Sequence, residues 1–187
     1  MNTLLLVIDF INDIIHLESK ISSSADYIEE HKVIDNANAA IAKARIKNIP
    51  IVHVKIGFSK NYIECPTNSP VFNKSKAHKA LQLGTWGTDF HEAMDVQAQD
   101  KIIIKHRVSA LYATELATIL CANNIDTVVI CGVATNMTVE LTARELHDRD
   151  YQVVILENAC GAATRQIHQA SLVTLARIGK IATVAAW

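Results

Sequence analysis

Short apolar runs alternate along the chain with longer segments in which apolar residues recur at helical spacing. This alternation is typical of a parallel sheet that is covered by helices on both faces. The runs are rich in β-branched residues, which favour buried strands. The predicted strands are residues 4–8, 51–56, 102–104, 127–131 and 152–156, with 181–184 as a weaker sixth.

Four segments carry the helical pattern. Residues 27–48 place apolar side chains near one helical face, and this pattern ends just before Pro50. Residues 112–123, 136–148 and 165–178 repeat it. Because crossovers between parallel strands are right-handed, these helices predict a doubly wound α/β fold whose functional sites lie beyond the carboxyl ends of the strands.

A long irregular segment, residues 57–99, interrupts the alternation. It contains Gly84, Gly87 and every proline except Pro50. A loop of this length inside a compact domain is usually functional or forms a lid. We therefore expect this excursion to cover the site rather than to link two domains.

Composition indicates a single globular domain over residues 1–187. Half of the residues are apolar and a fifth are charged, which suits one compact core. The formal net charge of -1 provides no positive field for nucleic acid or for an anionic membrane. No run approaches the roughly 18 apolar residues of a membrane span, so we expect a cytoplasmic protein. Its partner is then a small molecule or another protein chain.

The four cysteines, Cys65, Cys121, Cys131 and Cys160, lie far apart in the sequence. They form no CxxC pair and have no histidine at zinc-finger spacing. A structural zinc site is therefore not expected, and the cysteines are predicted to be reduced thiols. Cys131 and Cys160 come close to the candidate chemistry in sequence, but their apolar neighbours predict a packing role for both.

Charged residues stand where two predicted strands end. Asp9 directly follows the first strand, and Lys105 follows the third. Taken alone, a strand-end Asp is often only a turn cap, and a lone Lys is most often a solvated charge. Because the carboxyl ends of parallel strands share one edge, the two side chains are predicted to pair across a common crevice.

The fourth strand runs into a tight strand-to-helix turn at residues 132–136. The start of a helix offers free backbone N–H groups, which suit a carboxylate or a developing oxyanion. The structural alternative is that Thr135 or Asn136 simply caps the helix that follows.

Residues 8–13, 105–111 and 132–144 resemble, in order and at similar spacing, the three signature blocks of the isochorismatase-like (cysteine hydrolase) family. Residues 84–91 are similar to the family's Gly-Thr-Pro-Gly stretch, with Trp86 in place of the proline. The resemblance spans nearly the whole chain. It implies a three-layer α/β sandwich with a six-stranded parallel sheet in the order 3-2-1-4-5-6. It also implies hydrolysis of a small amide, an N-carbamoyl compound or a vinyl ether.

By the same resemblance, Asp9 is the catalytic acid/base and Lys105 is its partner. The Val133–Ala134 peptide bond matches one that is cis in the family, and the N–H groups of Ala134 and Thr138 match its oxyanion hole. Thr138 itself occupies the position of the family's nucleophilic cysteine. The residues expected to line the substrate pocket are Phe10, Trp86, Tyr112 and Asn136.

Threonine at position 138 limits how much of the family's mechanism carries over. A threonine hydroxyl is far less acidic than a thiol and needs a well-placed base before it can attack. Isochorismatases proper also lack the cysteine and use the Asp as a proton donor, and residues 105–110 look more like their version. We therefore expect hydrolysis without a cysteine acyl-enzyme, with Thr138 mainly shaping the pocket. The alternative is a catalytically silent member that serves as a small-molecule-binding or oligomeric scaffold.

Neither a metal nor an organic cofactor is expected. The region that carries metal ligands in nicotinamidases reads His53-Val54-Lys55-Ile56 here, with no carboxylate at the matching spacing and a lysine that would repel a cation. His53 is instead predicted to be a hydrogen-bonded core residue. The high apolar content, together with the habit of the family, predicts a homo-oligomer, either a dimer or a larger assembly.

Overall fold

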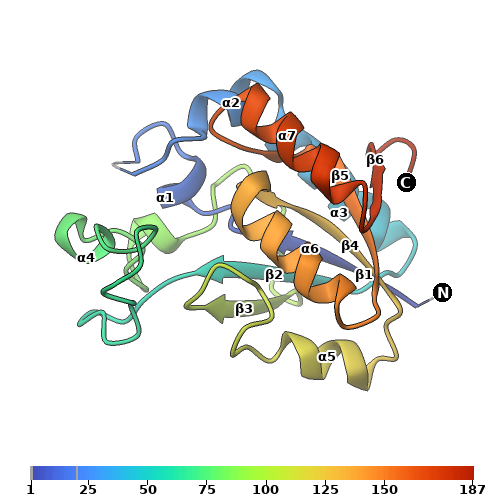
Figure 1. Ribbon diagram of the computed structural model, residues 1–187, viewed down its shortest axis with the longest axis horizontal. Helices are drawn as coiled ribbons and strands as arrows, with labels where there is room; N and C mark the ends of the chain where they lie inside the picture. Colours follow the sequence, from blue (N-terminus) through green and yellow to red (C-terminus); the bar gives the residue numbers. More distant parts are fainter. Residues whose placement is uncertain (1, 20) are drawn as a thin grey trace.

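The computed structural model describes residues 2–19 and 21–187. Within them, six strands form one sheet in the order β3-β2-β1-β4-β5-β6, and every neighbouring pair is parallel (Figure 1). The predicted sheet, including its strand order, is confirmed. The strands are β1 (Thr3–Ile8), β2 (Ile51–Ile56), β3 (Lys101–Lys105), β4 (Thr127–Val133), β5 (Gln152–Gly161) and β6 (Lys180–Ala182).

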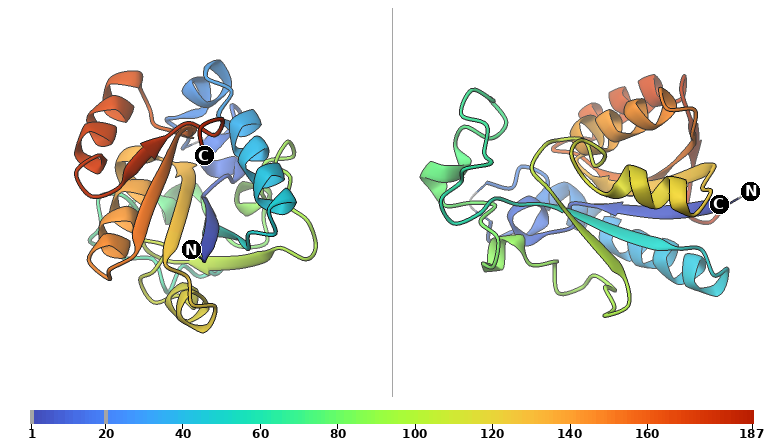
Figure 2. Two further views of the ribbon diagram at one scale, coloured as in Figure 1. Left: turned by 90° about the vertical axis from the view of Figure 1, so that its right-hand side faces the viewer. Right: turned by 90° about the horizontal axis from the view of Figure 1, so that it is seen from below.

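Helices cover both faces of this sheet, which makes the predicted three-layer sandwich. Figure 2 shows α2 and α3 on one face and α5, α6 and α7 on the other. No helix in the described residues is both long and apolar enough to cross a membrane. The helices are α1 (Asn12–Ile15), α2 (Ala25–Glu30), α3 (Val33–Ile46), α4 (Ser75–His78), α5 (Leu116–Ala122), α6 (Glu140–His147) and α7 (Arg165–Leu175).

Three predicted helices differ from those observed. The one predicted over residues 136–148 opens as a single turn of π-helix at Thr135–Val139, and the other two differ for a local reason. The pattern over residues 27–48 is split into α2 and α3, because Lys32 has a φ of 51° and a left-handed residue cannot continue a right-handed helix. The helix predicted from residue 112 begins only at Leu116. The Thr114 hydroxyl donates to the Ala110 carbonyl at 2.6 Å and accepts from the Leu116 N–H at 3.2 Å, which holds the preceding residues in turns.

The central strands β1 and β4 are buried on both faces. Leu4, Leu5, Leu6 and Ile8 are all fully buried, so β1 shows no polar alternation, as expected for a parallel strand between two helical layers. At the end of β4, a Cβ atom on Gly132 would lie 2.9 Å from the Ile8 carbonyl oxygen. A glycine is therefore required where β4 passes closest to β1.

The excursion is an ordered part of the domain. It projects beyond the carboxyl ends of the strands (Figure 2). A second apolar cluster joins Phe58, Phe72 and Leu81 of the excursion to Ile11 and to Ile56 at the end of β2. The buried Asp13 carboxylate ties it to α1 by accepting the Leu81 N–H at 2.6 Å. A carboxylate that accepts a backbone N–H forms one of the stronger hydrogen bonds in proteins.

A cluster of charged residues links α3 to the amino ends of β2 and β3. Both guanidinium ends of Arg45 donate to the Asp100 carboxylate at 2.8 Å, and His53 Nε2 lies 3.2 Å from Asp100 Oδ2, as predicted for a hydrogen-bonded core histidine. Burial raises the pKa of Asp100, but hydrogen bonds from Arg45 and the Gln97 N–H, with the charge of Arg45, outweigh it and hold the pKa at about 2. Against its ordinary value of 3.8, this corresponds to about 2 kcal/mol of folding stability.

We expect Asp100→Asn to lower the free energy of unfolding at pH 7 by roughly 2–3 kcal/mol, because it leaves the Arg45 guanidinium without its buried counter-charge. The difference from wild type should shrink as the pH falls from about 4 toward 2, since unfolded Asp100 takes up its proton before folded Asp100 does. Urea unfolding across this pH range measures both effects.

Asp95→Asn is the matched control, because Asp95 lies 3.5 Å from the same guanidinium but its side chain is 40% exposed. It should cost less than about 1 kcal/mol. The lowered pKa assigned to Asp100 would be contradicted if both variants lost the same free energy of unfolding. It would also be contradicted if the loss in Asp100→Asn did not change with pH.

Candidate active site

The structure brings Asp9, Lys105 and Thr138 together at the carboxyl edge of the sheet. Lys105 Nζ lies 2.8 Å from Asp9 Oδ2 and donates to Thr138 Oγ1 at 3.0 Å. All three residues are buried, with exposed fractions of 4% for Asp9, 2% for Lys105 and 3% for Thr138. They come from the ends of β1 and β3 and from the turn after β4, which are far apart in sequence.

Asp9 is fixed by two hydrogen bonds with the backbone of β2. Its N–H donates to the Val54 carbonyl at 2.8 Å, and its Oδ1 accepts the Ile56 N–H at 2.7 Å. Its φ is 61°, a left-handed conformation that is uncommon outside glycine and is found at functional sites more often than elsewhere. One carboxylate oxygen is thereby held by β2, and the other faces Lys105.

The Lys105 ammonium is surrounded by oxygen atoms. Besides Asp9 and Thr138, it donates to the carbonyls of Arg107 at 3.2 Å and Val108 at 2.8 Å. A buried ammonium is tolerated only when it is paired and hydrogen-bonded. The Asp9 carboxylate provides the countercharge, so the pair adds little net charge to the site.

Both hydrogen-bonding roles of the Thr138 hydroxyl are assigned by its partners. An ammonium can only donate, so Thr138 Oγ1 accepts from Lys105. A carbonyl can only accept, so the hydroxyl proton goes to Val108 O at 2.9 Å. The proton of this hydroxyl is therefore directed to a backbone carbonyl and not to Asp9.

The turn after β4 has an unusual backbone. The Val133–Ala134 peptide bond is cis, as the resemblance implied. Residues Thr135–Val139 then form a single turn of π-helix, which leads into α6. The Ala134 carbonyl accepts the N–H groups of Met137 at 3.1 Å and Val139 at 3.3 Å, which closes the turn. Within helices of soluble proteins, such π-turns occur frequently at functional sites.

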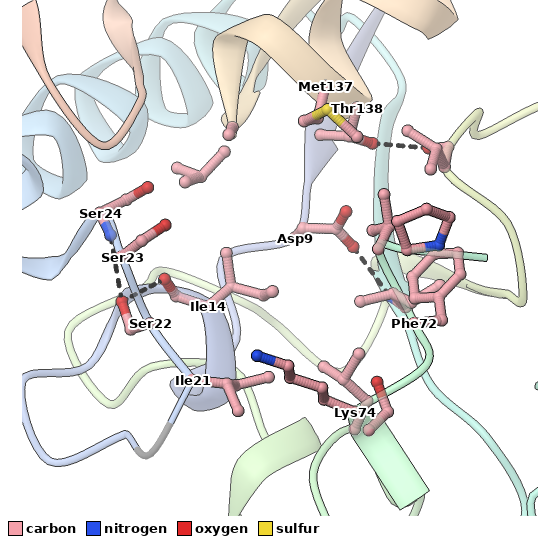
Figure 3. A pocket seen from close by; sticks show the side chains of 18 of the residues that line it. Asp9, Ile14, Ile21, Ser22, Ser23, Ser24, Phe72, Lys74, Met137 and Thr138 are labelled. Atoms are coloured by element: carbon pink, nitrogen blue, oxygen red, sulfur yellow. Dashed lines mark hydrogen bonds between the residues drawn. The ribbon is translucent and has the colours of Figure 1, made fainter.

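A cavity of about 480 Å³ opens beside these residues. Asp9, Lys105, Val133, Ala134 and Thr138 all line it, which places the resemblance-based catalytic and oxyanion-hole residues around one space. Figure 3 shows Ser22, Ser23 and Ser24 on the side of the cavity away from Thr138, with Lys74 extending from the excursion. The other residues of this far wall are Pro70, Val71, Phe72, Ser75, His78 and Leu81 from the excursion, and Ile14 and Ile21 from the segment before α2.

The four residues expected to line the substrate pocket, Phe10, Trp86, Tyr112 and Asn136, do not line this cavity. Phe10 is completely buried in the main core. Trp86 is 47% exposed and lies edge-on against His16, Tyr112 is 59% exposed, and Asn136 is exposed at the start of the π-turn. These four residues lie close to the signature blocks in sequence, but they do not line the cavity in the structure.

Sequence reasoning missed the residues that form the far wall. Ser22, Ser23, Ser24, Lys74 and His78 stand in short or irregular segments without apolar periodicity. Their only signal was indirect, because the excursion that carries Lys74 and His78 was expected to cover the site. The chain before α2 gave no comparable indication.

The cysteines near the site are unsuited to nucleophilic attack. Cys131 and Cys160 are buried, and burial raises the pKa of Cys131 well above its usual range and that of Cys160 to about 12. The thiolate is the reactive form, so such thiols are inert. Among residues 2–19 and 21–187, no three His, Cys, Asp or Glu side chains lie close enough together to hold a metal ion.

Comparisons with known proteins agree with this fold. The family model described as Isochorismatase domain matches residues 3–186. An isochorismatase family protein of Escherichia coli O157:H7, YecD, is 36% identical over 141 residues, which are 75% of this chain and 73% of that protein. The ureidoacrylate amidohydrolase RutB of Acinetobacter baylyi is 29% identical over 184 residues, which are 91% of this chain and 75% of that protein.

Among solved structures, an isochorismatase-like hydrolase from Alkaliphilus metalliredigens superimposes with a TM-score of 0.81 at 26% identity, and the match covers 99% of this chain and 96% of that one. The family model, the relatives and the fold therefore agree over nearly the full described length. The chain belongs to the isochorismatase family of hydrolases.

Proposed function

We propose that this protein hydrolyses a small amide or carbamoyl substrate in the cavity beside Asp9, without a cysteine acyl-enzyme. The observation that carries the proposal is the buried Asp9–Lys105 pair, 2.8 Å apart, on the wall of a cavity large enough for a small molecule. The relative named ureidoacrylate amidohydrolase supports the carbamoyl class. The Asp9 acid/base group also suits the hydrolysis of a vinyl ether.

In this reaction Asp9 acts first as a base and then as an acid. The carboxylate takes a proton from a water molecule in the cavity, and the water oxygen forms a bond to the substrate carbonyl carbon. The carbon–nitrogen bond then breaks, and Asp9 returns the proton to the leaving nitrogen. Lys105 keeps the carboxylate in place and balances its charge through the cycle.

The turn after β4 provides the electrophilic side of the site. In the proposed reaction the backbone N–H groups of Ala134 and Thr138 donate to the oxygen that becomes negative when the carbonyl is attacked. Preorganised donors of this kind contribute a large part of the rate enhancement in acyl-transfer enzymes. Thr138 contributes its backbone and holds Lys105, while its hydroxyl takes no part in bond formation.

The far wall favours a substrate with an anionic group. Four charged or titratable residues line the cavity: Asp9, Lys105, Lys74 and His78. The first two compensate one another, so the remaining charge comes from Lys74. A carboxylate on the substrate, placed away from the scissile bond, would complement this wall.

A protein that binds the same small molecules without turnover is the second candidate. The observation that favours it is the Thr138 hydroxyl, which is already engaged by Lys105 and Val108. The experiments that follow separate the two candidates.

Asp9→Asn should abolish most of the hydrolysis found when wild type is screened on a panel of amides, N-carbamoyl compounds and enol ethers. An asparagine keeps the shape of the side chain but cannot exchange a proton, and losing a general acid/base costs on the order of a hundredfold or more in kcat. Circular dichroism verifies that the variant is folded. Activity retained within tenfold would remove Asp9 from the chemistry, and no turnover on any compound would favour the binding candidate.

Thr138→Ala and Thr138→Ser should keep activity within about tenfold of wild type on the same substrate, a change of roughly 1.4 kcal/mol in transition-state stabilisation. The reason is that neither variant loses a nucleophile. An acyl-enzyme trapped on Thr138 and seen by intact-protein mass spectrometry would disprove this role. Thr138→Cys, tested in parallel, shows whether the site is a disabled cysteine amidase, which requires activity in that variant alone.

Lys74→Ala should raise the KM for N-carbamoylglycine by roughly 3- to 10-fold, as expected for one partly solvated charge contact. The KM for neutral ethylurea should not change. Lys76→Ala is the matched control, because Lys76 is also exposed on the excursion but does not line the cavity. If turnover is absent, calorimetric Kd values replace KM. A similar effect of both variants, or an effect on the neutral compound, would argue against a substrate anion at Lys74.

A further inference from the structure

The turn after β4 carries two buried threonine hydroxyls, and only one of them belongs to the site described above. Thr138 faces Lys105, on the sheet side of the cavity. Thr135, three residues earlier, is completely buried and makes a hydrogen bond of 2.8 Å with Nδ1 of His168. His168 lies in α7, in the outer helical layer, and is 3% exposed.

α7 contacts both ends of this π-turn. His168 meets Thr135 at its start, and the Ser171 hydroxyl donates to Glu140 Oε2 at 2.8 Å just after its end. His168 and Ser171 are one helical turn apart, so both project from one face of α7. The π-turn is therefore held from the cavity side through Thr138 and from the helical layer through α7.

The imidazole of His168 is itself held in place. Its ring centroid lies 5.5 Å from that of Tyr27, and Tyr27 is stacked on His31 at 4.0 Å. Burial, with a smaller contribution from the nearby His31, lowers the pKa of His168, which favours the neutral ring. A neutral ring has one donor and one acceptor nitrogen, so either tautomer can pair with a hydroxyl.

We propose that His168 is a positioning residue for the reaction: through the Thr135 hydroxyl it fixes the turn whose backbone N–H groups, at Ala134 and Thr138, face the reacting carbonyl. The proposal rests on the proposed hydrolysis for its kinetic consequence. His168 touches no substrate and does not line the cavity beside Asp9. Its effect is geometric, since donors displaced by a fraction of an ångström no longer match the oxyanion.

His168→Ala should lower kcat by roughly 10- to 100-fold, in the range that misplaced catalytic groups cost, while KM changes by less than about threefold. His168→Asn, which can keep a hydrogen bond to Thr135, should recover most of the loss. Thr135→Val should reproduce His168→Ala, and the double variant should be no worse than either single one, because both remove the same contact. Gln166→Ala, an exposed position on α7, is the matched control and should match wild type.

Hydrogen exchange followed by mass spectrometry tests the geometry without any substrate. The amides of Met137 and Val139 bond to the Ala134 carbonyl and so report whether the turn stays closed. Exchange of a peptide covering residues 134–139 should accelerate at least tenfold in His168→Ala and Thr135→Val, and should be restored in His168→Asn.

Hydrogen exchange and kinetics together separate the positioning role of His168 from the proposed hydrolysis. Faster exchange in the variants, with no turnover by wild type, would keep the role of His168 in fixing the turn and reject the hydrolase function. Unchanged exchange, or a kcat in His168→Ala within twofold of wild type, would overturn the positioning role. So would a loss that appears only as a lower melting temperature, with kcat per folded molecule unchanged.

Discussion

The ion pair between Asp9 and Lys105 is the interaction on which the carboxyl edge of this fold depends. Moving two charges out of water costs several kcal/mol for each ion, and only close pairing with further hydrogen bonds offsets that cost. The surrounding backbone meets this requirement. Ile56 donates to the carboxylate, and the carbonyls of Arg107 and Val108 accept from the ammonium. Removing either partner would leave the other as an unpaired buried charge.

Much of the fold could be predicted from the sequence, because a strand buried on both faces leaves a strong local signal. The apolar run that becomes β1 is an example, and Asp9 directly after it marks the edge where chemistry collects. The residues of the far wall of the cavity stand in no such sequence pattern. Lys74 reaches the cavity because distant contacts fold the excursion back, such as the one from Leu81 to Asp13. The contact between Thr135 and His168 likewise joins residues 33 positions apart and follows no pattern in the sequence.

Threonine at position 138 changes the chemical roles that the other site residues have to fill. A thiolate would have provided an attacking atom close to Lys105. This hydroxyl instead donates a hydrogen bond to the Val108 carbonyl and accepts one from Lys105. In the hydrolysis proposed above, the attacking atom therefore comes from solvent. The ion pair and the cis turn still suit a carbonyl, so in that proposal the threonine changes the nucleophile and not the class of bond that is broken.

The excursion packs in a second apolar cluster, which is separate from the main core and to which Ile11 and Ile56 also belong. In the wall that the excursion presents to the cavity, Phe72 and Leu81 belong to this cluster, whereas Lys74 and His78 are exposed and can be replaced without disturbing the sheet. The buried pair of Asp9 and Lys105 has no such freedom, since both side chains are hydrogen-bonded to backbone groups around them. A descendant of this chain could thus change which small molecule the cavity accepts through exposed positions of the excursion alone, and keep the buried ion pair unchanged.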